Sequence, residues 1–358
     1  MKIAQVCPRY YPYIGGVETH VKEISERLVN RGYEIDVLTT DPEGKLPKVE
    51  TINNVTIRRF KSWAPNESYY FSWALKNYLT KNSKNYDIVH AHSYHAFPAF
   101  YAAQAKRGNK LVFTPRYHGG GHTLFRNLLH IPYKLLGRKI LEKADKIICL
   151  SEYERKLLLS NFRLEEKKVI VIPNGINTIE FKNLKKRKKN KYSRMILCVS
   201  RLEKYKGIDY LIRVLPKLDA GISLVIVGKG PYKKALMKLV HKLALENRVK
   251  FYSDLPRKEL LQLYSHADIF VLLSKYEAFG NVVAEALASG TPCIVANASA
   301  LKHWVDNKNC FGIDYPINLN RLAKLINEVI GKEVKGVKLQ DWNDVVKQLE
   351  NIYLQVLS

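Results

Sequence analysis

Two glutamates with seven residues between them, Glu277 and Glu285, have the spacing that most directly predicts chemistry in this sequence. Glu277 follows the apolar run 269–273, which has the length of a buried strand. Glu285 lies about two helical turns further on, among the apolar residues of 282–288. A carboxylate in such surroundings needs a polar partner, unless both glutamates are solvated helix residues. Together the two carboxylates can hold hydroxyl groups at two ends of a polyhydroxylated ligand.

The chain bends into a helix shortly after Glu277. Gly280 and Asn281 allow the bend, and residues 282–288 have helical spacing until Gly290-Thr-Pro292 ends the helix. Backbone N–H groups at the start of such a helix favour an anion. The stretch therefore predicts a turn between a strand and a helix that can receive a charged ligand.

Two cations follow an earlier predicted strand, 195–200. Arg201 leaves the end of this strand, and Lys206 stands at the entry to the next helix. At the carboxyl end of a parallel strand such cations can neutralise a diphosphate without a metal, whereas isolated surface cations would only be solvated. Gly228 and Gly230 form another strand-to-helix turn, which can pass backbone close to a nucleotide.

Two glycines near the N-terminus also lie in a turn between a strand and a helix. Gly15 and Gly16 lie between a predicted strand, 3–7, and an amphipathic helix, 17–28. They let backbone approach a phosphate at the helix N-terminus. The alternative is a mere tight turn, because the sequence is not a G-x-G-x-x-G fingerprint.

His118 follows the predicted strand 110–114 and precedes three glycines, 119–121. A histidine at the carboxyl end of a strand suits contact with a sugar or stabilisation of a leaving group. His122 is the alternative candidate for this role. A single histidine in this place can also be an ordinary hydrogen-bonded residue.

A third group of histidines resembles a metal cluster. His90 and His92 share one face of a predicted strand, and His95 follows closely. No carboxylate or cysteine nearby in the sequence completes a ligand set. We therefore expect a structural strand here and no metal.

Strand and helix patterns alternate along the whole chain, which predicts an α/β protein with doubly wound sheets. The segment 182–194 interrupts the pattern with eight basic residues and no acidic one, as a solvated linker does. We predict one domain at 1–176, a basic linker at 177–194 and a second domain at 195–340. An amphipathic C-terminal helix, 341–358, should pack back on the first domain.

Composition narrows the class of protein further. The chain has 358 residues, 46% of them hydrophobic and 26% charged, which is typical of a globular protein. No signal peptide and no membrane-spanning run is expected, and the five scattered cysteines indicate buried thiols in a reducing cytoplasm. A formal net charge of +26 predicts an anionic partner: nucleic acid, an acidic lipid surface or a phosphorylated ligand. The alternative is a soluble basic protein whose lysines are only solvated.

The motifs and their order resemble one enzyme family. The E-x7-E pair at 277–285, the R-x4-K-G pattern at 201–207 and the Pro173-Asn-Gly175 turn resemble those of the retaining, nucleotide-sugar-dependent glycosyltransferases of group 1 (family 4). The resemblance implies a GT-B fold, in which two Rossmann-like domains face a central cleft. It also implies metal-independent transfer of a hexosyl group without a cofactor, with the acceptor on the N-terminal domain and the nucleotide sugar on the C-terminal domain.

The resemblance also implies roles for individual residues. Arg201 and Lys206 would stabilise the departing diphosphate, Glu277 would hold the sugar hydroxyls, and His118 would contact the sugar. The donor-binding residues would be Gly15, Gly16, Gly228, Gly230, Phe279, Gly280, Asn281 and Glu285, the last of which would hold the ribose. The glycine that usually grips the base in this family is missing at 252–255, which leaves the nucleotide base open.

The acceptor lies beyond these motifs. The segment 125–140 mixes bulky apolar and basic residues, as interfacial helices do. It predicts a peripheral protein on the cytoplasmic face of an anionic membrane with a lipid-linked or glycan acceptor; the alternative is an ordinary helix packed on the sheet.

Three other classes of protein remain open at this point. A nucleotide-sugar epimerase of the same fold would convert the donor alone. A basic nucleic-acid-binding protein would bind DNA tightly in a salt-sensitive way, although no reading motif is present and no nucleic acid is expected. A binding module would show affinity without turnover.

Overall fold

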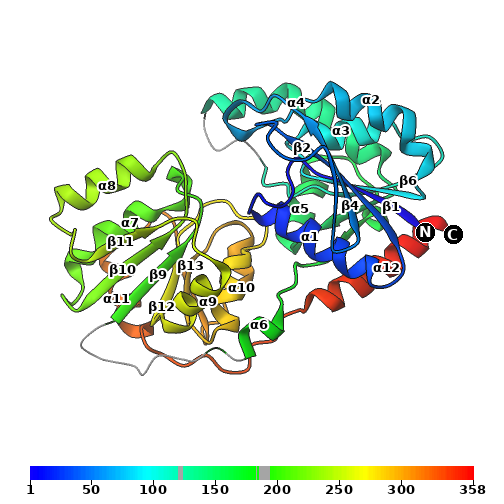
Figure 1. Ribbon diagram of the computed structural model, residues 1–358. Helices are drawn as coiled ribbons and strands as arrows, with labels where there is room; N and C mark the ends of the chain where they lie inside the picture. The colour runs from blue at the N-terminus through cyan, green and yellow to red at the C-terminus, as the bar shows by residue number, and fades with distance from the viewer. Residues whose placement is uncertain (120–123, 183, 185–193) are drawn as a thin grey trace. The chain divides into compact units, whose positions relative to one another are not determined.

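The computed structural model of the protein describes residues 1–119, 124–182, 184 and 194–358 (Figure 1). The chain folds as two compact units: unit 1 comprises residues 1–175 and 340–358, and unit 2 comprises residues 176–339. Within the segment predicted as a basic linker, Thr178–Lys182 forms helix α6, and residues 183 and 185–193 lie outside the described part.

Unit 1 is built on an eight-stranded sheet with the order β3-β4-β2-β1-β5-β6-β7-β8. All pairs are parallel except the antiparallel pair of β3 with β4. The strands are β1 (Lys2–Val6), β2 (Glu34–Asp41), β3 (Val49–Ile52), β4 (Val55–Lys61), β5 (Ile88–His92), β6 (Lys110–Thr114), β7 (Lys146–Cys149) and β8 (Val169–Val171).

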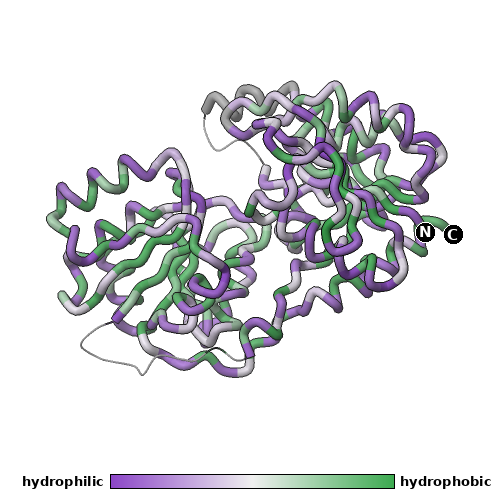
Figure 2. Tube along the Cα trace, in the orientation of Figure 1, coloured by the Kyte–Doolittle hydropathy of each residue, from purple (hydrophilic) through white to green (hydrophobic). Residues whose placement is uncertain are grey.

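Helices cover both faces of this sheet, and β6, β7 and β8 are almost continuous apolar runs, whereas the other strands mix apolar and polar residues (Figure 2). Buried side chains of α2, α3, α4 and α5 form the core on one face, and those of α1 and α12 form the core on the other. The helices are α1 (Gly16–Val29), α2 (Trp73–Asn82), α3 (Phe97–Gln104), α4 (Leu124–Lys143), α5 (Glu152–Asn161) and α12 (Trp342–Leu357).

Helix α2 starts later than its apolar pattern predicts. The pattern places the helix at 69–79, but Tyr69 and Tyr70 have φ values of 66° and 53°, which no α-helix accommodates. The helix begins at Trp73 instead, after Ser72, whose Oγ accepts a hydrogen bond from the backbone N–H of Leu75 at 3.3 Å. A serine cap therefore fixes the start of this helix.

Unit 2 has six parallel strands in the order β11-β10-β9-β12-β13-β14. They are β9 (Arg194–Val199), β10 (Ile222–Val227), β11 (Val249–Tyr252), β12 (Ile269–Leu272), β13 (Cys293–Ala296) and β14 (Cys310–Ile313). Besides α6, its helices are α7 (Ile208–Val214), α8 (Lys233–Lys242), α9 (Arg257–His266), α10 (Asn281–Ala288) and α11 (Leu319–Val329).

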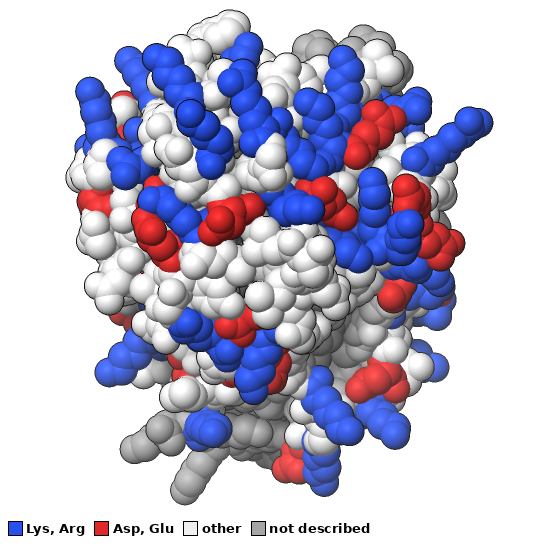
Figure 3. All heavy atoms as spheres, turned by 90° about the vertical axis from the view of Figure 1, so that its right-hand side faces the viewer, with Lys and Arg blue, Asp and Glu red and all other residues white. Residues whose placement is uncertain are grey.

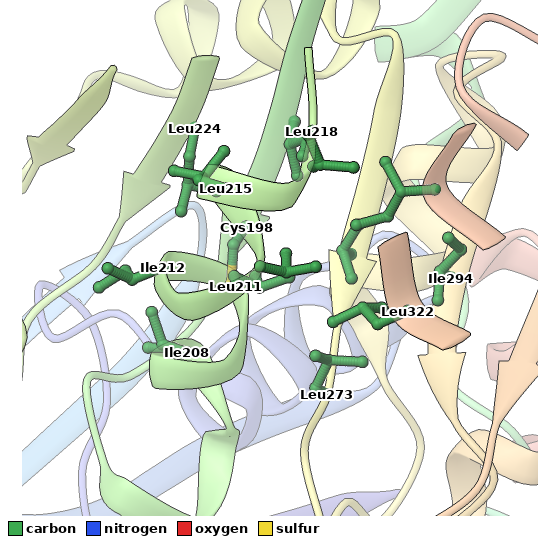
Figure 4. Packing of buried hydrophobic residues seen from close by; sticks show 14 of the residues in the cluster. Cys198, Ile208, Leu211, Ile212, Leu215, Leu218, Leu224, Leu273, Ile294 and Leu322 are labelled. Carbon is green, nitrogen blue, oxygen red and sulfur yellow. The ribbon is translucent and has the colours of Figure 1, made fainter. Parts of the chain in front are cut away.

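The core of unit 2 lies on both faces of its sheet. On one face, Leu211 and Leu215, together with Leu322 of α11, pack on strand residues such as Leu224 and Ile294 (Figure 4). On the other face, α9 and α10 cover the sheet. Short 3₁₀ segments complete the two units at Pro65–Glu67, Ser83–Asn85, Glu166–Lys168, Lys204–Lys206, Leu215–Lys217 and Ser299–Trp304.

A buried polar network ties α12 to the sheet of unit 1. The two ring nitrogens of His90 lie 2.7 Å from Tyr353 Oη and 2.8 Å from Thr114 Oγ1. His92 Nε2 lies 2.8 Å from Gln5 Oε1, and Gln5 in turn donates to Tyr353. Burial lowers the pKa of His90 to about 3, with a further contribution from the positive charge of Arg116. His90 is therefore neutral at pH 7.

We predict that this network makes the protein less stable in weak acid. Between pH 7 and pH 5 the unfolded chain protonates His90 near its ordinary pKa of about 6.5, whereas the folded protein does not. The free energy of unfolding should lose about 2 kcal/mol at pH 5 through this residue. Urea denaturation at both pH values will measure the loss, and His90→Gln should remove this part of the pH dependence.

The comparison with the variant is needed because Glu154 acts in the opposite direction. Burial raises the pKa of Glu154 to about 7, so the folded protein takes up this proton before the unfolded chain does. Glu154 is present in both proteins, and its effect cancels in the difference. The same pH dependence in the wild type and in His90→Gln would contradict the prediction.

Candidate active site

The strand order of unit 2 reverses between β9 and β12. Strands β10 and β11 lie on one side of this point, and β13 and β14 lie on the other. In an open parallel sheet the segments leaving such a point diverge and make a crevice at the carboxyl ends of the strands. Arg201 and Lys206 follow β9, and Glu277 follows β12. The topology thus brings three predicted catalytic residues to one edge of one sheet.

Lys206 and Glu277 form an ion pair at this edge. Lys206 Nζ lies 2.5 Å from Glu277 Oε1, and the two side chains are only 10% and 18% exposed. Burial is the largest single influence and lowers the pKa of Lys206, but the Glu277 carboxylate and Tyr205 together outweigh burial and raise the pKa above its ordinary value. The positive charge of Arg201 also acts on this pKa, in the lowering direction. Lys206 therefore carries a full charge in this site.

Gly207 allows the loops that carry Lys206 and Glu277 to come into contact. A Cβ on Gly207 would lie 2.4 Å from the carbonyl oxygen of Leu273, at the end of β12. Next to it, Lys275 donates its backbone N–H to the carbonyl of Tyr205 at 2.9 Å. The loop after β9 is thus held directly against the loop after β12.

The loop after β12 is held from its other side by the 3₁₀ segment Ser299–Trp304. The Oγ of Ser299 accepts the backbone N–H of Glu277 at 2.9 Å, and Trp304 Nε1 donates to the carbonyl of Phe279 at 2.7 Å. Gly280 has a φ of 96° and caps α10, whose first residue is Asn281. Sequence analysis missed Ser299 and Trp304, because their contacts join segments that are distant in the chain.

Glu285 has the polar partner that its apolar surroundings predict. Its Oε1 accepts a hydrogen bond from Arg257 Nη1 at 2.7 Å. Arg257 begins α9 and also contacts Glu180 of α6, with 2.8 Å between Nη2 and Oε2. The need for a partner is therefore confirmed, while the identity of the partner, Arg257, was missed by sequence analysis.

Arg201 points toward solvent, with a side chain 55% exposed and its Nη2 at 3.5 Å from Glu203 Oε1. Its loop lies against the turn that carries Gly228 and Gly230. A Cβ on Gly228 would lie 1.9 Å from the carbonyl oxygen of Ser200, and a Cβ on Gly230 would lie 2.3 Å from that of Leu202. The two glycines thus bring backbone close to backbone and position the Arg201 loop.

The remaining predicted site residues belong to unit 1. Gly15 precedes the first turn of α1, which begins at Gly16. The carboxylate of Glu18 is buried beside Gly15 and accepts a hydrogen bond from Arg9 Nε at 3.2 Å. These contacts fix the loop after β1.

His118 follows β6, and its ring stacks on that of His95 with 4.9 Å between the centroids. The alternative candidate, His122, lies outside the described residues. Within the described ranges, no three His, Cys, Asp or Glu side chains are grouped so that they could hold a metal ion.

Comparison with known proteins identifies the class and then the family. Two doubly wound parallel-sheet units define a GT-B protein: HepE from Anabaena, solved with UDP-glucose, aligns with a TM-score of 0.79 at 19% identity, covering 99% of this chain and 100% of that one. Residues 14–180 match the model of glycosyltransferase family 4, and residues 180–343 match that of group 1 glycosyl transferases.

Two curated relatives extend over nearly all of the chain. An uncharacterized glycosyltransferase of Methanocaldococcus jannaschii is 31% identical, over 99% of this chain and 98% of its own length. The GPI3 subunit of phosphatidylinositol N-acetylglucosaminyltransferase from Saccharomyces cerevisiae is 24% identical, over 99% of this chain and 83% of its own length. The protein belongs to the group 1 glycosyltransferases and is a glycosyltransferase enzyme.

We predict that Gly228→Ala will destabilise unit 2 strongly. The added Cβ would meet the Ser200 carbonyl, and a φ of 148° is accessible almost only to glycine. The expected loss is about 3 kcal/mol or more in the free energy of unfolding, measured by urea denaturation.

Gly331→Ala is the matched control for that experiment. Gly331 has a φ of 83°, but a Cβ there would meet nothing within 4 Å. Its cost should be limited to backbone strain, about 1 kcal/mol. Equal losses in the two variants would show that the contact with Ser200 does not constrain the turn.

Proposed function

We propose that this glycosyltransferase moves a hexosyl group from a nucleotide-diphosphate sugar to a hydroxyl acceptor and retains the anomeric configuration. The observation that carries the proposal is the pairing of Lys206 with Glu277 at the point where the sheet order reverses. A cation and a carboxylate side by side suit a ligand in which a phosphate adjoins a sugar. The UDP-glucose complex of HepE supports a nucleotide sugar as the donor.

In this mechanism the donor's anomeric carbon loses its bond to the diphosphate oxygen and gains a bond to the acceptor oxygen on the same face. Lys206 and Arg201 stabilise the negative charge that develops on the departing diphosphate. The acceptor's proton passes to a diphosphate oxygen, so no protein base is assigned. His118 contacts the sugar.

The donor is held by groups around the leaving diphosphate. Glu277 accepts hydrogen bonds from the sugar hydroxyls, and Glu285 accepts them from the ribose. The loop from Phe279 through Gly280 to Asn281 offers backbone N–H groups at the start of α10. Gly15 and Gly16 let the loop after β1 approach the phosphates, and Gly228 and Gly230 act through the Arg201 loop. Lys206 and Arg201 neutralise the charge of the diphosphate, so the proposed reaction uses neither a metal nor another cofactor.

The reaction is tested by donor binding and then by turnover. A thermal-shift panel of UDP-, GDP- and ADP-sugars in EDTA should give one nucleotide class that raises the melting temperature at ligand excess. With that donor, Glu277→Ala should lower turnover by about 100- to 1,000-fold, because an interaction made with the reacting sugar is lost. Glu246→Ala, at the amino end of β11, should leave turnover unchanged.

Three results would contradict the proposal. They are near-normal turnover by a folded Glu277→Ala variant, loss of activity in EDTA, and an inverted anomeric configuration in the product by NMR. Conversion of the donor without any acceptor would indicate an epimerase instead.

We further propose an acceptor carried on an anionic lipid surface. In the described part of the chain, none of the helices has the length and hydropathy needed to span a membrane. Unit 1 exposes Trp63 and Trp73, at 68% and 75%, and Lys76 Nζ lies 4.9 Å from the centre of the Trp73 ring. On the face in Figure 3, Lys and Arg project from most of the surface, with Asp and Glu among them. Exposed tryptophan beside lysine suits a membrane interface.

Two further observations bear on this acceptor. The Saccharomyces relative is named for a phosphatidylinositol substrate, which supports a lipid acceptor here. Helix α4 lies in the segment predicted to be interfacial. Its Tyr133 and Ile140 are buried in the core of unit 1, whereas Leu135 is 67% exposed. The described part of this helix thus packs on the sheet, and the two tryptophans become the stronger candidates for membrane contact.

We predict that the protein sediments with vesicles containing phosphatidylserine at low salt and is released at high salt, because the attraction is partly electrostatic. The double variant Trp63→Ser/Trp73→Ser should sediment several-fold less. Leu354→Ser, at a residue of α12 that is 54% exposed, is the control and should sediment like the wild type. Failure of the wild type to sediment would exclude the membrane proposal while leaving the transfer reaction untouched.

A further inference from the structure

Arg257 joins two carboxylates that come from different parts of unit 2. Its Nη1 donates to Glu285 Oε1 at 2.7 Å, and its Nε and Nη2 donate to Glu180 Oε2 at 3.0 and 2.8 Å. The guanidinium also lies over the ring of Phe181, with 5.8 Å to the centroid. All three nitrogens of the side chain are therefore engaged, which fixes the plane of the group.

The charges of this cluster favour a neutral ligand. Burial lowers the pKa of Arg257, but Glu285 and then Glu180 outweigh burial and raise the pKa above its ordinary value. One cation between two carboxylates leaves the cluster with an excess of negative charge. A phosphate would be repelled there, whereas hydroxyl groups can donate to the carboxylates. A carboxylate accepts more than two hydrogen bonds, so the contact with Arg257 leaves capacity for a ligand.

The start of helix α9 brings Arg257 to Glu285 of the neighbouring helix α10. Arg257 is the first residue of α9, and Glu285 lies in α10, which packs beside α9 on the same face of the sheet. Without Arg257, the like charges of Glu180 and Glu285 would repel each other and turn the Glu285 side chain away.

We propose that Arg257 is a positioning residue, which orients the Glu285 carboxylate toward the ribose hydroxyls of the donor and is itself held by Glu180. The inference rests on the ribose-binding role of Glu285 in the proposed function. It predicts that Arg257 determines selectivity for a ribonucleotide over a 2′-deoxyribonucleotide donor and contributes little to the chemical step.

The test compares the KM of the ribonucleotide donor with that of its 2′-deoxy analogue. The wild type should prefer the ribonucleotide by about tenfold, which is the effect of one charge-assisted hydrogen bond. Arg257→Gln should lose this preference by raising the KM of the ribonucleotide alone, with kcat nearly unchanged. Arg257→Lys should retain part of the preference and keeps the experiment decisive if Arg257→Gln does not fold. Glu259→Gln, an exposed change in the first turn of α9, should behave as the wild type.

The outcomes separate this inference from the function on which it rests. An equal rise of both KM values in Arg257→Gln and Arg257→Lys would mean a merely structural role and would overturn the proposal. If Glu285→Gln keeps the full preference for the ribonucleotide, then Glu285 does not bind the ribose, and the failure lies in the proposed function.

Discussion

The ion pair between Lys206 and Glu277 is the constraint on which the arrangement of unit 2 depends. Taking two charges out of water is costly unless they meet with good geometry, and here they meet at 2.5 Å. The contact requires the loops after β9 and β12 to touch, which in turn requires a residue without a side chain at Gly207. The backbone N–H of Glu277 is then held by Ser299. In the proposed reaction the diphosphate competes with Glu277 for the positive charge of Lys206. Donor binding therefore weakens the ion pair, and the Glu277 carboxylate can accept hydrogen bonds from the sugar hydroxyls.

The cations of the site are paired, and this places the large positive charge of the protein elsewhere. Lys206 is matched by Glu277, Arg257 by two carboxylates, and Arg201 by the more distant Glu203. The formal charge of +26 therefore resides mainly on the surface, where it acts as a long-range field and not as a catalytic group. In the proposed function this surface charge would attract the protein to an anionic surface, while the paired charges of the site would hold a sugar and a ribose.

Sequence analysis could predict the sheets because parallel strands covered on both faces are apolar runs. Strand β3 has an exposed and intermediate pattern, so no such run marks it. The predicted start of α2 was wrong because Tyr69 and Tyr70 adopt a left-handed backbone conformation that the periodicity of the sequence does not reveal. In the site, the apolar neighbours of Glu285 predicted a partner, but Arg257 could not be named. That contact depends on how α9 packs beside α10, which is a property of the folded unit.

The glycines show why one pattern supports two interpretations. A glycine between a strand and a helix indicates that something approaches the backbone closely, but it does not say what. Gly228 and Gly230 were predicted to bind the donor, and their missing side chains make room for the carbonyls of Ser200 and Leu202. At Gly15 the same space is occupied by the Glu18 carboxylate. Because protein atoms fill these positions, the glycines act in the proposed reaction through the loops that they place. In the proposed reaction, the direct contact with the donor's charge then falls to Lys206 and Arg201.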